Sequence, residues 1–148
     1  MSVLGERVVA EARRWIGTPY QHQASCIGAG ADCLGLLRGV WRGLLGGEPE
    51  HVPPYSPDWA EPGGTEVLWQ AACRHLCQKP IAEEAAGDVL LFRMRDGSIA
   101  KHLGIAGQLG PLASFIHAFN GHGVVESPLS TPWRRRIAAR FEFPEGVA

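Results

Sequence analysis

The sequence has no long hydrophobic run, no strong charge of either sign and few cysteines. No apolar stretch approaches the roughly 20 residues that a membrane-spanning helix needs. The net charge is only −1, so no broad field favours nucleic acid or anionic lipid. The one basic run, Arg134-Arg135-Arg136, is small enough to be a solvated strand end. We therefore expect neither nucleic-acid binding nor membrane binding.

The N-terminus lacks the basic start and apolar centre of a signal peptide. We therefore expect synthesis in the cytoplasm, and an external substrate would require another carrier. Without a secretory context, the four cysteines do not indicate a disulfide framework. Cys73 and Cys77 flank His75, but no further ligands occur at matching spacing for a metal site. We interpret both cysteines as small core residues.

The length of 148 residues fits one domain, 1–148, with a hydrophobic core of its own. Apolar periodicity predicts helices first and strands afterwards, with tight turns between the strands. That order indicates an α+β fold in which N-terminal helices pack on an antiparallel meander. The predicted helices cover 2–16, 33–45 and 65–78, and the predicted strands cover 88–94, 100–106, 112–119, 124–126 and 135–143.

The segment 30–37 joins a glycine-rich loop to an apolar helix. Asp32 is a good N-cap, and Cys33 falls at or near the first helical position. The free N–H groups and the dipole of a helix start favour the thiolate over the thiol. Cys33 is therefore a candidate nucleophile, held in place by a largely apolar and buried helix.

Two histidines lie inside predicted strands. His102 shares a strand face with small residues, which suggests the floor of a cleft. If the two strands pair through the turn at 107–111, His102 and His117 become near neighbours on one surface. A pair of histidines next to a nucleophile supplies a base and a group that orients it.

These residues have defined chemical roles in nucleophilic catalysis. Cys33 would attack a carbonyl, and His102 would accept the thiol proton and later protonate the leaving amine. His117 would hold the far nitrogen of His102, a task for which Asn120 is a weaker candidate. The Cys33 N–H and the Tyr20 hydroxyl are candidate donors to the oxyanion.

The remaining candidates are less specific. His22 and Gln23, in the loop before Cys33, are candidates for substrate contact, with loop packing as the alternative for His22. A zinc site of Cys33, His102 and His117 has suitable ligand types but lacks a further His or carboxylate and any His-Glu-x-x-His motif, so no metal is predicted. Three further histidines are most simply surface residues: His51, His75 and His122.

The chain resembles the NlpC-type cell-wall peptidases, a papain-like family of cysteine enzymes, from about residue 6 to residue 143. Each motif is short, but all occur in order and in the expected helix and strand context. The motifs are Gly17-Thr18-Pro19-Tyr20, Asp32-Cys33-Leu34-Gly35-Leu36, Gly87-Asp88-Val89-Leu90-Leu91-Phe92, His102-Leu103-Gly104-Ile105 and Ile116-His117-Ala118. The segments 20–23 and 53–59 further resemble the branch found in phages and gene transfer agents.

The resemblance implies a papain-like minimal fold with the catalytic cysteine at a helix N-terminus. It implies a triad of Cys33, His102 and His117 with Tyr20 beside the nucleophile, and no metal or organic cofactor. The implied substrates are stem peptides of peptidoglycan, often at the bond from D-γ-glutamate to a diamino acid. Leu34 stands where the family usually has serine. This difference leaves the nucleophile intact but bears on which substrate is recognised.

The branch resemblance implies partners in a phage-like tail or particle, which would carry the enzyme to the cell wall or periplasm. Two other readings stay open. One is a tail-assembly binding module without turnover. The other is an acyltransferase with the same thiol chemistry. The latter predicts an extended apolar groove or a membrane-binding helix, and the sequence shows neither.

Overall fold

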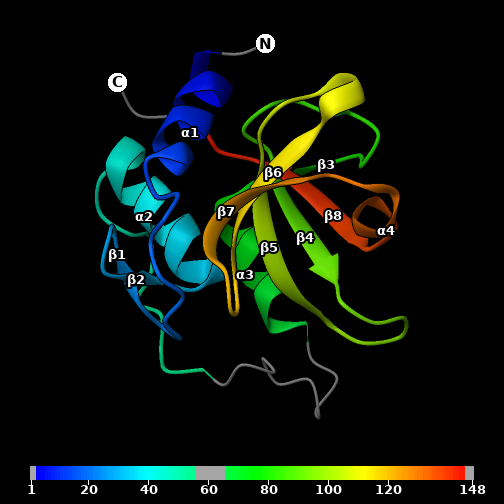
Figure 1. Ribbon diagram of the computed structural model, residues 1–148. Coiled ribbons are helices and arrows are strands. Elements are labelled where there is room, and N and C mark those ends of the chain that lie inside the picture. Colours follow the sequence, from blue (N-terminus) through cyan, green and yellow to red (C-terminus); the bar gives the residue numbers. More distant parts are fainter. Residues whose placement is uncertain (1–2, 56–65, 146–148) are drawn as a thin grey trace.

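The computed structural model describes residues 3–55 and 66–145 (Figure 1). Part of the segment 53–59, residues 56–59, lies outside the described residues. The helices are α1 (Val3–Arg13), α2 (Cys33–Leu45), α3 (Val67–His75) and α4 (Thr131–Arg135), with a 3₁₀ turn at Gly110–Leu112. The strands are β1 (Ser25–Cys26), β2 (Gly30–Ala31), β3 (Cys77–Lys79), β4 (Val89–Arg93), β5 (Ala100–Ala106), β6 (Ser114–Phe119), β7 (Gly123–Pro128) and β8 (Ile137–Glu142).

The main sheet is antiparallel and has the order β3-β8-β4-β5-β6-β7. Strands β4 to β7 follow one another as a meander, which confirms the predicted α+β class. The last strand, β8, does not extend the meander, because it returns to pair with the free edge of β4. A separate two-stranded ribbon, β1 and β2, lies in the loop that precedes α2.

The third predicted helix is shorter than its apolar pattern indicated. It ends at His75, because Leu76 turns to an extended conformation and the chain continues as β3 along the edge of β8. The pairing Cys77↔Glu142 places residue 77 on this edge strand. Cys73 and Cys77 are both exposed, so their interpretation as core residues is wrong.

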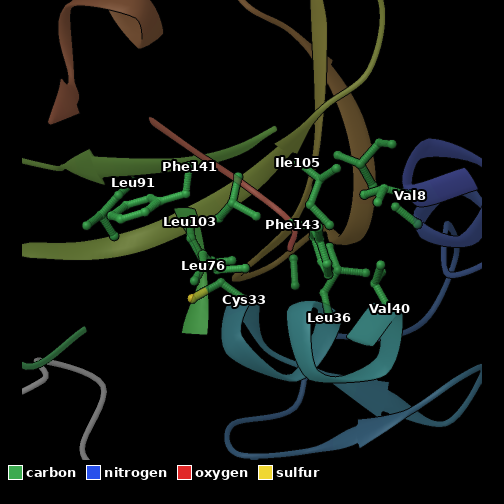
Figure 2. Close-up of a cluster of buried hydrophobic side chains, with 14 of the residues drawn as sticks. Val8, Cys33, Leu36, Val40, Leu76, Leu91, Leu103, Ile105, Phe141 and Phe143 are labelled. Atoms are coloured by element: carbon green, nitrogen blue, oxygen red, sulfur yellow. The ribbon is translucent and has the colours of Figure 1, made fainter. Parts of the chain in front are cut away.

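Two apolar clusters cover opposite faces of the sheet, because side chains alternate along each strand. Helices α1 and α2 pack together beside the sheet (Figure 1), and α2 meets the face that carries Leu103 and Ile105 (Figure 2). Helix α2 also packs closely against the turn that follows α1, since a Cβ on Gly39 would lie 2.0 Å from the Trp15 ring. The second cluster lies on the face of Phe92, where Trp133 packs against it.

Candidate active site

Cys33 is the first residue of α2, as the sequence predicts. Asp32 is the N-cap in an extended conformation, and its Oδ1 accepts the Gly35 N–H at 2.7 Å. Gly35 is required by close packing, because a Cβ there would lie 1.8 Å from the carbonyl oxygen of Ala24. The cap and the loop together fix the position of the Cys33 backbone.

The Cys33 side chain is buried in the cluster between α2 and the sheet (Figure 2). Burial, followed by the charge of Asp32, raises the pKa of the Cys33 thiol to about 12. The N–H groups of Leu103, Leu34 and Cys33 itself face the sulfur and act in the opposite direction. The expectation that the helix start lowers this pKa is therefore wrong, since desolvation outweighs the backbone donors.

The two strand histidines are in direct contact. His102 Nε2 lies 2.8 Å from His117 Nδ1, which confirms that the strands bring these side chains together. In the pairing of β5 with β6, Ile105 lies opposite Ile116. This register makes His102 and His117 diagonal neighbours rather than directly opposite residues. His117, rather than the exposed Asn120, is the partner of His102.

Burial keeps both imidazoles neutral at pH 7. It lowers the pKa of His102 to about 3, with a further contribution from His117. It lowers the pKa of His117 to about 4, with a further contribution from His122. With a neutral thiol as well, the described arrangement is a thiol and two imidazoles rather than a thiolate–imidazolium pair.

The face around His102 is filled with aromatic rings and is not the floor of a cleft. The His102 ring centroid lies 5.8 Å from that of Phe92, 5.8 Å from that of Trp133 and 6.1 Å from that of Phe119. These rings come from the flanking strands and α4, and they occupy the space that the small residues of β5 leave. The predicted cleft at this face is therefore wrong.

A cavity of about 450 Å³ lies instead on the face of Leu103. It is lined by residues of α2, of α3, of the sheet and of the segment 48–55, and its lining is mainly apolar. Leu34 and Leu103 both line it, and each follows directly after a candidate catalytic residue. The cavity therefore begins beside the N–H groups that face the Cys33 sulfur.

Residues 22, 23 and 32 together hold Tyr55 above the helix start. The Tyr55 hydroxyl donates to Asp32 Oδ2, which also accepts the Gln23 N–H at 2.7 Å. The Tyr55 carbonyl oxygen lies 2.7 Å from His22 Nε2 and accepts from Gln23 Nε2 at 2.7 Å. These bonds agree with loop packing for His22 and Gln23, and their contact with substrate stays a prediction.

Tyr20 lies close to Cys33. It is half-buried and forms an isolated parallel bridge with Ala31. Burial, followed by the charges of Cys33 and Asp32, raises the pKa of its hydroxyl. Tyr20 is therefore protonated at pH 7 and can donate a hydrogen bond near the sulfur.

Several solved structures with a similar fold are NlpC/P60 proteins. The NlpC/p60 domain of the peptidoglycan hydrolase SagA is 26% identical with a TM-score of 0.61, over 96% of this chain and 99% of that domain. The chain has the NlpC/P60 fold. A lipoprotein-like NLP/P60 protein of Staphylococcus aureus is 18% identical with a TM-score of 0.63, over 99% of this chain and 43% of that one. An NlpC/P60 protein of Bacillus cereus is also 18% identical, with a TM-score of 0.64, over 94% of this chain and 40% of that one.

The chain thus spans less than half the length of the two NlpC/P60 proteins from Staphylococcus aureus and Bacillus cereus. No protein-family model matches it, and no curated protein does. Over residues 3–55 and 66–145, no group of three His, Cys, Asp or Glu side chains could hold a metal ion. Within the same residues, no helix is long and apolar enough to cross a bilayer.

Two polar residues of the candidate site are not predicted from the sequence. Ser127 Oγ lies 2.9 Å from His117 Nε2, and the expected strand 124–126 ended just before it. Extension of that strand by two residues would have placed Ser127 on the His117 face. Tyr55 lies in the segment 53–59, and no local sequence pattern links it to Asp32.

Proposed function

We propose that the chain is a cysteine peptidase or amidase that hydrolyses peptide bonds in peptidoglycan stem peptides. The observation that carries the proposal is the contact of His102 with His117 on β5 and β6, the two strands that α2, with Cys33 as its first residue, packs against. The sulfur of Cys33 reaches the same strand, since the N–H of Leu103 faces it. The peptidoglycan hydrolase SagA, whose domain has this fold, supports the substrate class.

The proposed reaction proceeds in two steps. As the Cys33 sulfur attacks the carbonyl carbon, its proton passes to Nδ1 of His102, because Nε2 is bound to His117. The tetrahedral intermediate expels the amine, which takes that proton from His102, and leaves a thioester on Cys33. Water then attacks the thioester with His102 as base, and the acid product and the thiol are released.

The oxyanion of each tetrahedral intermediate needs hydrogen-bond donors. We assign this role to the Cys33 N–H at the start of α2 and to the Tyr20 hydroxyl. Asp32 acts as the helix cap that places Cys33, and its carboxylate is already engaged by Gly35, Gln23 and Tyr55.

We further propose cleavage of the bond between D-γ-glutamate and the diamino acid of the stem peptide, as part of a phage-like tail or particle that acts at the cell wall or periplasm. The family resemblance supports the bond, and the segments 20–23 and 53–59 support the particle. Detection of the protein in purified particles tests the second point, and its absence from them would contradict it.

Digestion of purified peptidoglycan tests the proposed activity. The wild type should release peptides with a new amine on the diamino acid, identified by mass spectrometry, and Cys33→Ala should release none. Cys73→Ala is the matched control, because it removes an exposed thiol and should digest like the wild type. Undiminished digestion by Cys33→Ala would contradict Cys33 as nucleophile. Specific peptide binding without digestion by the wild type would favour the binding module.

The apolar cavity gives one specific reason to keep acyl transfer as a second candidate. The sequence showed no apolar groove, yet a cavity of about 450 Å³ begins at Leu34 and Leu103. A volume of this size is typical of small-molecule sites. Incubation with a long-chain acyl thioester and an amine acceptor distinguishes the two functions. Amide product formed faster than peptidoglycan is cleaved would favour the transferase.

A further inference from the structure

We propose that Ser127 is a positioning residue, which fixes the proton-bearing nitrogen of His117 and, through it, of His102. The inference rests on the proposed function, because it concerns the base that would serve Cys33. No sequence motif and no residue role assigned above includes Ser127.

The strand pairing places Ser127 at the far nitrogen of His117. In the β6–β7 register, Ser127 is opposite Phe115 and His117 is opposite Val125, so Ser127 is a diagonal neighbour on the same face. Its Oγ lies 2.9 Å from His117 Nε2. Ser127 is half-buried, whereas His117 is 1% exposed. The serine therefore ends a hydrogen-bonded chain that starts at His102.

The hydrogen-bonded series of His102, His117 and Ser127 has only two possible proton arrangements. Each neutral imidazole has one N–H donor and one bare nitrogen acceptor, and the 2.8 Å contact between His102 and His117 needs one proton between its nitrogens. In the first arrangement, His102 Nε2–H donates to His117 Nδ1, and His117 Nε2–H donates to Ser127. In the second, the Ser127 O–H donates to His117 Nε2, and His117 Nδ1–H donates to His102 Nε2. His102 then carries its own proton on Nδ1.

Only the first arrangement supports the proposed reaction. It leaves Nδ1 of His102 bare, so this nitrogen can accept the thiol proton. The second arrangement places a proton there and removes the base. The choice between them is therefore a choice between an active and an inactive histidine pair.

Ser127 favours the first arrangement by providing an oxygen for a buried N–H. A half-buried hydroxyl can accept this N–H and direct its own O–H toward solvent. Without the oxygen, the first arrangement would leave an orphaned N–H of His117, while the second would leave only an unpaired acceptor. Buried orphaned N–H groups are the rarer of the two in proteins. The Trp133 ring, 5.3 Å from His117 between centroids, restricts access to the same imidazole.

Nitrogen-15 NMR of the histidine rings tests the proposal without substrate. The wild type at pH 7 should show His117 protonated on Nε2 and His102 bare on Nδ1. Ser127→Ala should lower the population of this tautomer pair, and Ser127→Thr should restore it. Ser130→Ala, which removes an exposed hydroxyl without a capping bond, is the matched control and should resemble the wild type.

Kinetics provide the second readout. If the orphaned N–H shifts the tautomer balance about a hundredfold, from about 10:1 to about 1:10, Ser127→Ala should lower kcat about tenfold with little change in KM. Ser127→Thr should recover most of this loss. Unchanged tautomers in Ser127→Ala, or a wild type with His117 protonated on Nδ1, would overturn the proposal. The wild-type spectrum keeps the test decisive even if Ser127→Ala does not fold.

Failure of this proposal is distinguishable from failure of the proposed function. If Cys33→Ala is inactive and the tautomers do not respond to Ser127, only the role of Ser127 is refuted. If wild-type peptidoglycan digestion is absent, the peptidase proposal fails, whereas the tautomer measurement still reports on Ser127.

Discussion

The buried histidine pair should make the folded protein sensitive to mild acid. In the unfolded chain both imidazoles take up protons as the pH falls below about 6.5. In the folded protein, the pKa is about 3 for His102 and about 4 for His117, so neither accepts a proton until much lower pH. Each folded pKa is depressed, so the stabilisation is complete above pH 6.5 and is lost progressively as the pH falls toward these values.

The magnitude follows from the difference in bound protons. Between pH 7.5 and pH 5, the unfolded state gains nearly one proton at each of the two sites and the folded state gains almost none. The free energy of unfolding should therefore fall by about 2 kcal/mol for each histidine, or about 4 kcal/mol for the pair. Urea unfolding at several pH values measures this change above the range where most carboxylates titrate.

Two variants make the measurement specific. His117→Asn removes one buried imidazole and should roughly halve the loss of stability between pH 7.5 and pH 5. His51→Gln removes an exposed imidazole and should leave the pH dependence as in the wild type. A wild-type stability that is constant over this interval would refute the reasoning, because it would mean that the folded protein protonates these histidines as easily as the unfolded chain.

Three other perturbations test contacts at the site and elsewhere in the fold. Tyr55→Phe deletes the hydroxyl that donates to Asp32 and should destabilise the protein by about 1.5 to 3 kcal/mol, as for bonds to charged groups; unchanged urea unfolding would contradict this. Asp88→Asn removes the charge paired with the buried Arg140 at 2.7 Å and should cost about 3 to 5 kcal/mol; a loss below about 1 kcal/mol would argue against the buried pair. Iodoacetamide at pH 7.5 should modify the three exposed cysteines before Cys33, as peptide mass spectrometry can resolve; preferential labelling of Cys33 would contradict its raised pKa.

Local patterns were sufficient for much of the framework. An Asp before an apolar helical repeat predicted the cap and the first residue of α2, because capping depends on neighbours in the chain. Strand alternation and a short turn predicted that His102 and His117 meet, because both lie on consecutive strands of a meander. These features involve short sequence separations and simple periodicities.

The features that the sequence did not predict depend on contacts between distant segments. The pKa of Cys33 is set by burial against the sheet, which a helix-start argument does not include. The space beside His102 is filled in part by Trp133, which lies outside the predicted strands. The strand β3 forms because β8 offers it an edge, although its residues continue a helical pattern. In each case the tertiary environment outweighs the local preference.

The most direct test of the central claim is the mass of the covalent intermediate. The wild type should be mixed with soluble stem peptide, quenched in acid within one turnover and digested for peptide mass spectrometry. We predict a thioester adduct of the acyl fragment on the peptide that contains Cys33, which Cys33→Ala does not form. Turnover of the stem peptide with no adduct on Cys33, or with an adduct on another residue, would contradict the account.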